Sequence, residues 1–135
     1  MSRSTLLIAA LAWSAALAMG WATYMPGMSG VFLLDDVPNL SGLAGVEGVA
    51  SAVNFILSGE AGPLGRPLAL ATFVPQADAW EHSAVPFLSV NILIHLTNAT
   101  LLWCVLYRLL DGRCRQTGER LFIAGAGAVL WMSMP

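Results

Sequence analysis

The chain has 135 residues, of which 57% are apolar and only 10% are charged, and its formal net charge is −2. Together with a mean hydropathy of +0.71, this composition is typical of a membrane protein and excludes an ordinary water-soluble domain. The chain contains no lysine and no basic run, so we expect no nucleic-acid partner.

The first predicted element is a transmembrane helix within residues 1–24, after a short cytoplasmic N-terminus that contains Arg3. About twenty residues, at about 1.5 Å of rise each, cross the roughly 30 Å hydrocarbon layer of a bilayer. A secretory signal is the alternative, because a charged start precedes an apolar region that ends in the small residues Ala16 and Ala18. Trp21 and Tyr24 favour the span, since aromatic residues of this kind anchor helices at the membrane interface.

Residues 25–85 form a predicted extracytoplasmic loop. This segment contains a single base, Arg66, against six acids, namely Asp35, Asp36, Glu47, Glu60, Asp78 and Glu81. The arginines lie instead before the first span and in the link 111–120 with its flanks, at positions 3, 108, 113, 115 and 120. Because basic residues favour the cytoplasmic side, we expect the N-terminus and this link to be cytoplasmic.

The pair Asp35-Asp36 follows an apolar run and lies where the chain would leave the bilayer. Adjacent carboxylates at a membrane exit are costly and favour a functional explanation, although a helix cap with solvated charges is the alternative. After the pair, we expect an amphipathic helix capped by Asn39 or Ser41. Its apolar residues recur mostly every three or four positions, at Leu40, Leu43, Val46, Val49, Val53, Ile56 and Leu57.

Residues 59–68 are predicted to form an ordered loop in which glycines permit close backbone approach and Pro67 fixes the chain after Arg66. A guanidinium has two obvious uses here. It can hold an anionic ligand, or it can pair with Asp35 or Asp36. We expect a short helix from Leu68 to Val74 that stops at Pro75, because proline cannot continue a helix.

The second predicted transmembrane helix covers residues 86–110. Asn91, His95 and Asn98 lie at i, i+4 and i+7, so we expect them on one helical face that points to a protein interior or a wet cavity. For His95, a packed and hydrogen-bonded histidine is the leading interpretation, and a proton carrier is the alternative.

Residues 121–135 are apolar but too few for a full span. We therefore expect the start of a third, truncated helix, and we expect the chain to be the N-terminal piece of a longer protein. Small residues at 124–128 predict close helix packing. The predicted fold class is thus an all-α membrane protein, with two complete transmembrane helices, a truncated third and a helical extracytoplasmic loop.

Three motifs follow one another along the chain. They are Phe32-Leu33-Leu34-Asp35-Asp36, Gly65-Arg66-Pro67-Leu68 with Thr72-Phe73, and Pro86-Phe87 followed by Val90-Asn91-Ile92-Leu93-Ile94-His95. This ordered set resembles the start of the multi-span GT-C glycosyltransferases, which use polyprenyl-phosphate sugar donors. The likeness is greatest to bacterial relatives of the transmembrane and tetratricopeptide-repeat O-mannosyltransferases, and it spans about residues 20 to 100.

This resemblance implies that Asp35 and Asp36 are the catalytic pair, with Arg66 as a phosphate or structural partner and Asn91 with His95 as a support under the site. It also implies a lipid-linked sugar as donor, a protein or glycan acceptor, and a location in the bacterial inner membrane among its lipids. A positioned carboxylate can accept the proton of an attacking hydroxyl, and the two aspartates could also share a divalent cation. The alternative function is a non-catalytic scaffold or a small subunit of a membrane complex.

Overall fold

The computed structural model describes residues 2–59 and 65–134, and every regular element within these ranges is a helix. This confirms the predicted all-α class. The elements in chain order are α1 Arg3–Tyr24, η1 Met25–Ser29, α2 Asp36–Leu40, η2 Ser41–Gly45, α3 Val49–Leu57, α4 Pro67–Phe73, η3 Val74–Ala79, α5 Val85–Leu109 and α6 Thr117–Met132.

The chain divides into two compact units. The apolar unit contains α1, α6 and the part of α5 from Asn91 onward, and the inserted unit runs from Gly27 to Val90. Two helices are long and apolar enough to cross a membrane, and they agree with the two predicted spans. They cover Arg3–Ser29, with a mean hydropathy of 1.7, and Val85–Leu109, with a mean hydropathy of 1.5.

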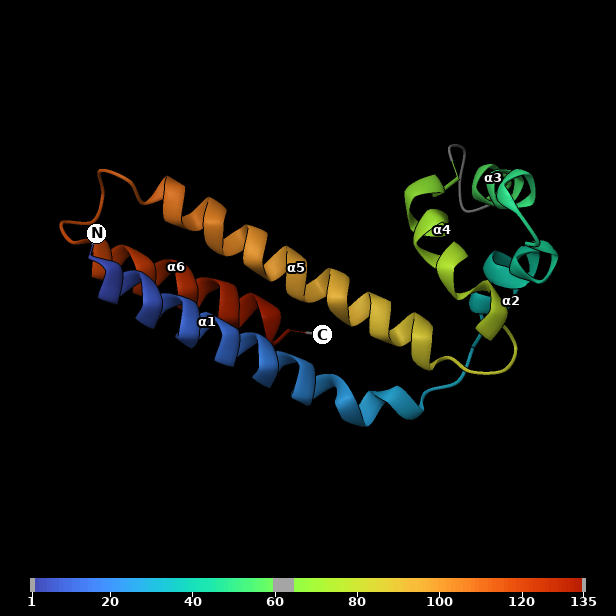
Figure 1. The fold of residues 1–135 in the computed structure, drawn as a ribbon, viewed down its shortest axis with the longest axis horizontal. Helices are drawn as coiled ribbons and strands as arrows, with labels where there is room; N and C mark the ends of the chain where they lie inside the picture. The colour runs from blue at the N-terminus through green and yellow to red at the C-terminus, as the bar shows by residue number, and fades with distance from the viewer. Residues whose placement is uncertain (1, 60–64, 135) are drawn as a thin grey trace. The chain divides into compact units, whose positions relative to one another are not determined.

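Within the apolar unit, α1, α5 and α6 lie side by side, and α5 runs opposite to the other two (Figure 1). Trp13 joins α1 to α5, because its indole stacks on Trp103 at 4.6 Å and its N–H donates to the Thr100 hydroxyl at 3.2 Å. On α6, Ala124 and Ala128 are fully buried. The small-residue segment therefore packs closely, as predicted.

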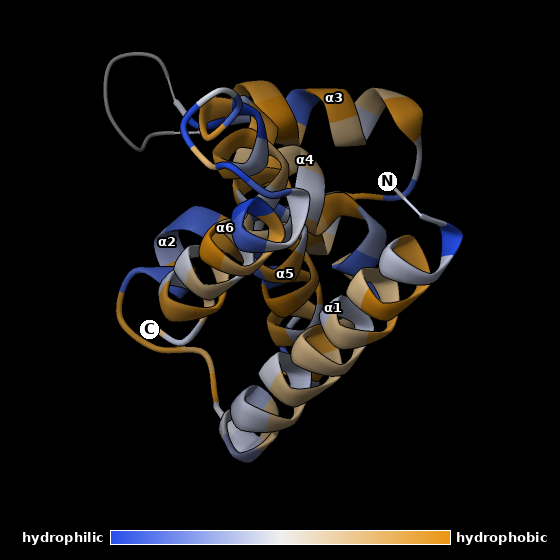
Figure 2. Cartoon of the chain, turned by 90° about the vertical axis from the view of Figure 1, so that its left-hand side faces the viewer, coloured by the Kyte–Doolittle hydropathy of each residue, from blue (hydrophilic) through white to orange (hydrophobic). Residues whose placement is uncertain are grey.

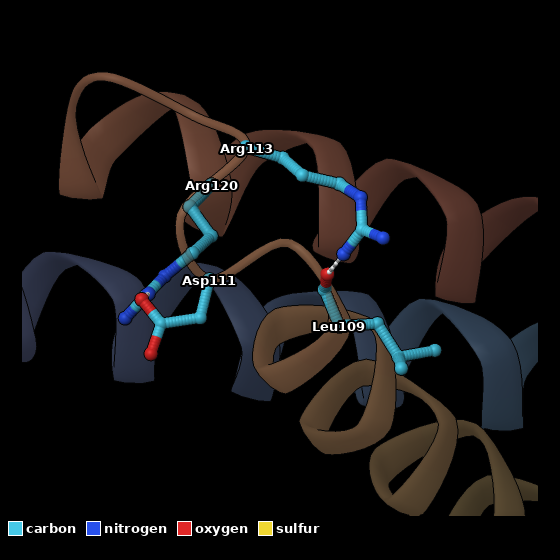
Figure 3. Close-up of polar contacts among 4 residues, drawn as sticks. All are labelled: Leu109, Asp111, Arg113 and Arg120. Atoms are coloured by element: carbon cyan, nitrogen blue, oxygen red, sulfur yellow. Dashed lines mark hydrogen bonds and ion pairs between the residues drawn. The ribbon is translucent and has the colours of Figure 1, made fainter.

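The link between α5 and α6 is fastened by polar contacts (Figure 3). Arg120 forms an ion pair with Asp111 and lies over the ring of Tyr107, with 3.8 Å between the guanidinium carbon and the ring centroid. Arg113 donates to the Leu109 carbonyl at the end of α5. The contacts of Arg120 hold the start of α6 against the end of α5 and the link, a role that the charge pattern alone did not indicate.

The inserted unit has its own apolar core, formed by Leu40, Leu43, Phe55, Leu70, Trp80 and Phe87. Phe32 packs against two of these rings, with centroids 4.7 Å from Trp80 and 5.2 Å from Phe87. Because this core lies entirely between residues 27 and 90, the segment predicted as a loop is a folded unit.

The single amphipathic helix expected after Asp36 is wrong. The chain instead forms α2, η2 and α3, with an extended break at Gly48. Gly42 and Phe55 explain the break, because a Cβ on Gly42 would lie 2.9 Å from the Phe55 ring. The phenylalanine thus packs back on η2, which one continuous helix would prevent. At the start of α3, the Ser51 hydroxyl accepts from the N–H of Gly48 at 3.0 Å.

Two smaller expectations also need correction. Asn39 lies inside α2 and Ser41 begins η2, so neither residue caps a longer helix. The short helix α4 agrees with prediction to within one residue, but Pro75 does not end the helical structure, because the 3-10 helix η3 follows α4 directly. Pro75 lies in the first turn of η3, where proline lacks only an N–H that would have no partner.

Candidate ligand pocket of the inserted unit

Four polar side chains line one hollow of about 250 Å³ in the inserted unit. They are Asp35, Asp36, Asn39 and Arg66. The walls between them are mostly apolar and are formed by Leu40, Gly59, Ala69, Leu70 and Phe73. Arg66 lies thirty residues after the acidic pair in the sequence, and the fold places it at the same hollow. A common site for the two sequence motifs requires this arrangement.

A tight turn presents the two carboxylates. The Asp36 carboxylate accepts from the Leu33 N–H at 2.8 Å, and the Asp36 N–H donates to the Leu33 carbonyl at 2.9 Å. Within this turn, Leu34 has a φ of 41°, a left-handed conformation that is strained for a leucine. The turn therefore holds Asp36 in place through its own side chain.

Asp35 is in a different situation. It stands at the N-cap position of α2 but its side chain makes no capping hydrogen bond, so it does not cap the helix, whereas its exposure agrees with the solvated charge of the helix-cap alternative. Its backbone carbonyl accepts from the Asn39 amide at 2.6 Å, while its exposed carboxylate has no hydrogen-bond partner among the described residues. Of the two acids, Asp35 is the one free to act on a ligand.

Arg66 is positioned by a close contact of two glycines. Gly65 has a φ of 61°, and a Cβ there would lie 2.8 Å from the Gly59 carbonyl oxygen. Leu70 packs on Gly59 from α4, and its N–H donates to the Arg66 carbonyl at 2.9 Å. The predicted close backbone approach in this loop therefore occurs at Gly59 and Gly65, whereas residues 60–64, Glu60 included, lie outside the described part of the chain.

The guanidinium of Arg66 forms no ion pair with Asp35 or Asp36. Within residues 2–59 and 65–134, the ion pair that the structure contains is Arg120 with Asp111. Arg66 is exposed at the hollow, so its charge is available to a ligand. Among the described residues, this arrangement favours the anionic-ligand use of Arg66 over a salt bridge with Asp35 or Asp36.

Asn91 and His95 belong to the apolar unit and do not line this hollow. His95 is half-buried, with its Nε2 3.0 Å from the Met132 carbonyl oxygen and 3.2 Å from the Tyr24 hydroxyl. Its ring stacks on Trp131 at 4.6 Å. These contacts confirm the interpretation of His95 as a packed, hydrogen-bonded residue, and its support of the site stays a prediction.

Asn91 and Asn98 are both exposed, so they do not point into the interior of the apolar unit with His95, and the wet cavity given as the alternative stays a prediction. The buried stripe of α5 in this region contains Ile92, Leu96 and Ala99. At roughly 100° per residue, this stripe is centred about 100° away from Asn91. His95 borders the stripe, whereas the two asparagines lie outside it.

The described residues contain no group of three or more histidine, cysteine, aspartate or glutamate side chains that could hold a metal ion. The two aspartates alone do not form a metal cage. Magnesium, however, is often bound by one or two carboxylates together with substrate phosphates. A divalent cation at Asp35 and Asp36 would therefore have to arrive with a phosphate-bearing ligand.

Sequence reasoning missed Asn39 and the apolar wall as parts of the site. Asn39 follows Asp35 by four residues, which is the one signal that could have placed it on the same helical face. The wall could not be foreseen, because Leu40, Leu70 and Phe73 meet only after the unit folds.

Comparison of the chain with protein-family models, with curated proteins and with solved structures finds no match.

Proposed function

We propose that this chain is part of a membrane glycosyltransferase, which moves a sugar from a polyprenyl-phosphate donor to a protein or glycan acceptor outside the cytoplasm. The observation that carries the proposal is the shared hollow of Asp35, Asp36 and Arg66. It combines a base for the acceptor with a cation for the donor phosphate, in a chain with two helices apolar enough to span a membrane.

In this proposal Asp35 is the catalytic base and Asp36 is a positioning residue. The Asp35 carboxylate accepts the proton of the acceptor hydroxyl as the oxygen forms a bond to the anomeric carbon. The bond between that carbon and the donor phosphate oxygen breaks at the same time, and the electron pair stays on the phosphate. Arg66 then stabilises the departing lipid phosphate with paired hydrogen bonds.

Two exposed leucines support a lipid-linked donor over a free sugar phosphate. Leu34 is 90% exposed and directly precedes Asp35, and Leu68 is 85% exposed and follows Arg66 by two residues. Exposed apolar side chains of this size are unfavourable in water but suit a hydrocarbon ligand or a membrane surface. Asp35 and Arg66 thus each have an exposed leucine nearby in sequence that can contact the prenyl chain.

The test is a sugar-transfer assay in membranes that contain the full-length protein, with a radiolabelled polyprenyl-phosphate sugar as donor. We expect Asp35→Asn to lower the transfer rate by at least about a hundredfold, the usual minimum contribution of a general base. Arg66→Gln should raise the KM for the donor, because it removes the charge that binds phosphate. Asp78→Asn is the matched control, since Asp78 is an exposed acid of the same unit that does not line the hollow.

Equal amounts of each variant must be present in the membrane fraction, so that loss of transfer is not loss of protein. Unchanged transfer in both Asp35→Asn and Arg66→Gln would contradict the proposal. The non-catalytic scaffold or small subunit would then be the better interpretation, and the hollow would be a binding surface for another protein.

A further inference from the structure

The helix α3 of the inserted unit exposes an apolar stripe. Its members are Val49, Val53 and Leu57, which are 84%, 46% and 73% exposed. They lie at i, i+4 and i+8, so at 3.6 residues per turn they follow one another along one face of the helix. Figure 2 shows hydrophobic colour over most of α3.

A different face of α3 already packs on the core. Phe55 is only 6% exposed and belongs to the core of the inserted unit, and Ile56 packs against that core. Asn54 and Ser58 are the polar residues that α3 and its C-terminal cap expose. The helix is therefore apolar on two faces, and a helix of this kind is normally covered on both.

Charge and connectivity indicate what covers the stripe. Residues 49–59 contain no charged side chain, whereas acids at 35, 36, 47, 78 and 81 lie elsewhere in the unit. Both ends of the inserted unit continue directly into the two helices that are apolar enough to span a membrane. A bilayer surface would thus be held within a few residues of this unit at all times, at a very high effective concentration.

We propose that α3 docks on this bilayer, with Val49, Val53 and Leu57 inserted at the boundary between lipid headgroups and acyl chains. The attraction is apolar, because the stripe has no basic residue for anionic headgroups. Docking rests on the membrane location in the proposed function but does not depend on sugar transfer. An inactive Asp35→Asn protein should dock as well as the wild type.

Single cysteines labelled with an environment-sensitive fluorophore test the docking. The chain is prepared with Cys104→Ser and Cys114→Ser, reconstituted in phosphatidylcholine vesicles, and labelled after Val53→Cys, Leu57→Cys or Asn54→Cys. Asn54 is the matched control, because it is an exposed residue of the same helix outside the stripe. Lipids with nitroxide groups on their acyl chains should quench the labels at 53 and 57 at least about twofold more than the label at 54.

Iodide in the water phase should show the reverse order, with the strongest quenching at 54. Equal iodide quenching at all three positions would mean that water covers the stripe and would overturn the proposal. Labels at 53 and 57 that neither quencher reaches would mean that a protein surface covers the stripe, which would overturn it too. Quenching by the lipid nitroxide that requires anionic lipid or disappears in high salt would contradict the apolar basis of the docking.

Discussion

At the scale of single residues, the two adjacent aspartates make different contacts. Asp36 accepts the Leu33 N–H at 2.8 Å, whereas the Asp35 carboxylate has no hydrogen-bond partner among the described residues. We expect Asp36→Ala to destabilise the inserted unit by about 1 kcal/mol, the usual contribution of one hydrogen bond. Asp36→Asn should restore most of this loss, because its amide oxygen can still accept, and Asp35→Ala should leave stability unchanged.

Thermal unfolding in detergent, followed by tryptophan fluorescence, measures these effects, since Trp80 lies in the core of the inserted unit. If Asp35→Ala destabilised the unit as much as Asp36→Ala does, Asp35 would be a structural residue and a poor candidate for the base.

Gly65 is the residue on which the position of Arg66 depends. Its φ of 61° and the 2.8 Å between its would-be Cβ and the Gly59 carbonyl oxygen leave no room for a side chain. We therefore expect Gly65→Ala to destabilise the inserted unit by about 1–3 kcal/mol and to weaken binding of polyprenyl phosphate. Gly45→Ala is the control, because a Cβ there has no atom within 4 Å, and it should change neither stability nor binding.

Unfolding midpoints and lipid-phosphate titrations of the two glycine variants provide the measurement. Equal stability of Gly65→Ala and Gly45→Ala would show that residues 59 and 65 do not approach each other as described.

At the scale of helices, the sequence predicts what depends on composition and misses what depends on tertiary contact. The helices α1 and α5 follow from long runs of apolar residues, which need no partner to be recognised. The break between η2 and α3 depends on Phe55 packing over Gly42, a contact between residues thirteen positions apart. The glycines at 42, 45 and 48 weakened the prediction of one helix, but they could not show where the chain turns.

The same distinction applies to the candidate site. Asp35, Asp36 and Arg66 were predicted from their charge in an apolar chain, since a charged group near a membrane requires an explanation. The exposed positions of Asn91 and Asn98 were not predicted. The spacing of these residues places them together with His95 on one side of a helix, but only neighbouring helices decide which part of that side is buried.

Close packing of α1 on the other helices of the apolar unit depends on Gly20. A Cβ at this buried position would lie 2.9 Å from side-chain atoms of both Leu96 and Met132. We expect Gly20→Leu to lower the free energy of unfolding by about 1–3 kcal/mol, because extra atoms in a packed interface force the helices apart. Ala22→Leu is the control on the same helix, since Ala22 is exposed.

Detergent-melting curves of the two variants should differ clearly, and Gly20→Leu should also weaken the stacking of Trp13 on Trp103. Indistinguishable curves would mean that α1 does not pack on α5 and α6 through Gly20.

Arg120 holds α5 and α6 together at the link through two contacts, one with Tyr107 and one with Asp111. We expect the two together to contribute more to stability than the ion pair with Asp111 alone. The Tyr107 side chain and, after it, the Asp111 carboxylate raise the pKa of Arg120, while burial opposes them. A raised pKa in a base adds stability that is lost only as pH rises through the folded-state pKa, so this contribution should be the same at neutral and at mildly acidic pH, where Asp111 is still ionised.

Removing the guanidinium loses the contacts with both Tyr107 and Asp111, whereas removing the carboxylate loses only one of them. We therefore expect Arg120→Ala to lower the unfolding midpoint more than Asp111→Asn does, at neutral and at mildly acidic pH. Equal losses in the two variants would show that the ion pair dominates the link.

At the scale of the whole molecule, charge is distributed unevenly along the chain. Five of its six basic residues lie at one end of the apolar unit, at positions 3, 108, 113, 115 and 120, where α1 begins and the link joins α5 to α6 (Figure 1). The inserted unit contains the remaining base and most of the acids. In membrane proteins the side richer in arginine and lysine is usually cytoplasmic, so we expect the basic end in the cytoplasm and the inserted unit outside.

A cysteine-accessibility experiment tests this orientation. With Cys104 and Cys114 changed to serine, we compare Asp78→Cys in the inserted unit with Arg115→Cys in the link, both of which replace exposed residues. A membrane-impermeant maleimide should label position 78 in intact cells, whereas position 115 should react only after the membrane is opened. Reversed labelling would invert the topology and place Asp35 and Arg66 on the side opposite to an extracytoplasmic acceptor. Labelling of both positions in intact cells would mean that α1 and α5 do not separate them by a bilayer, and the site would then lose its access to a lipid-linked donor held in the membrane.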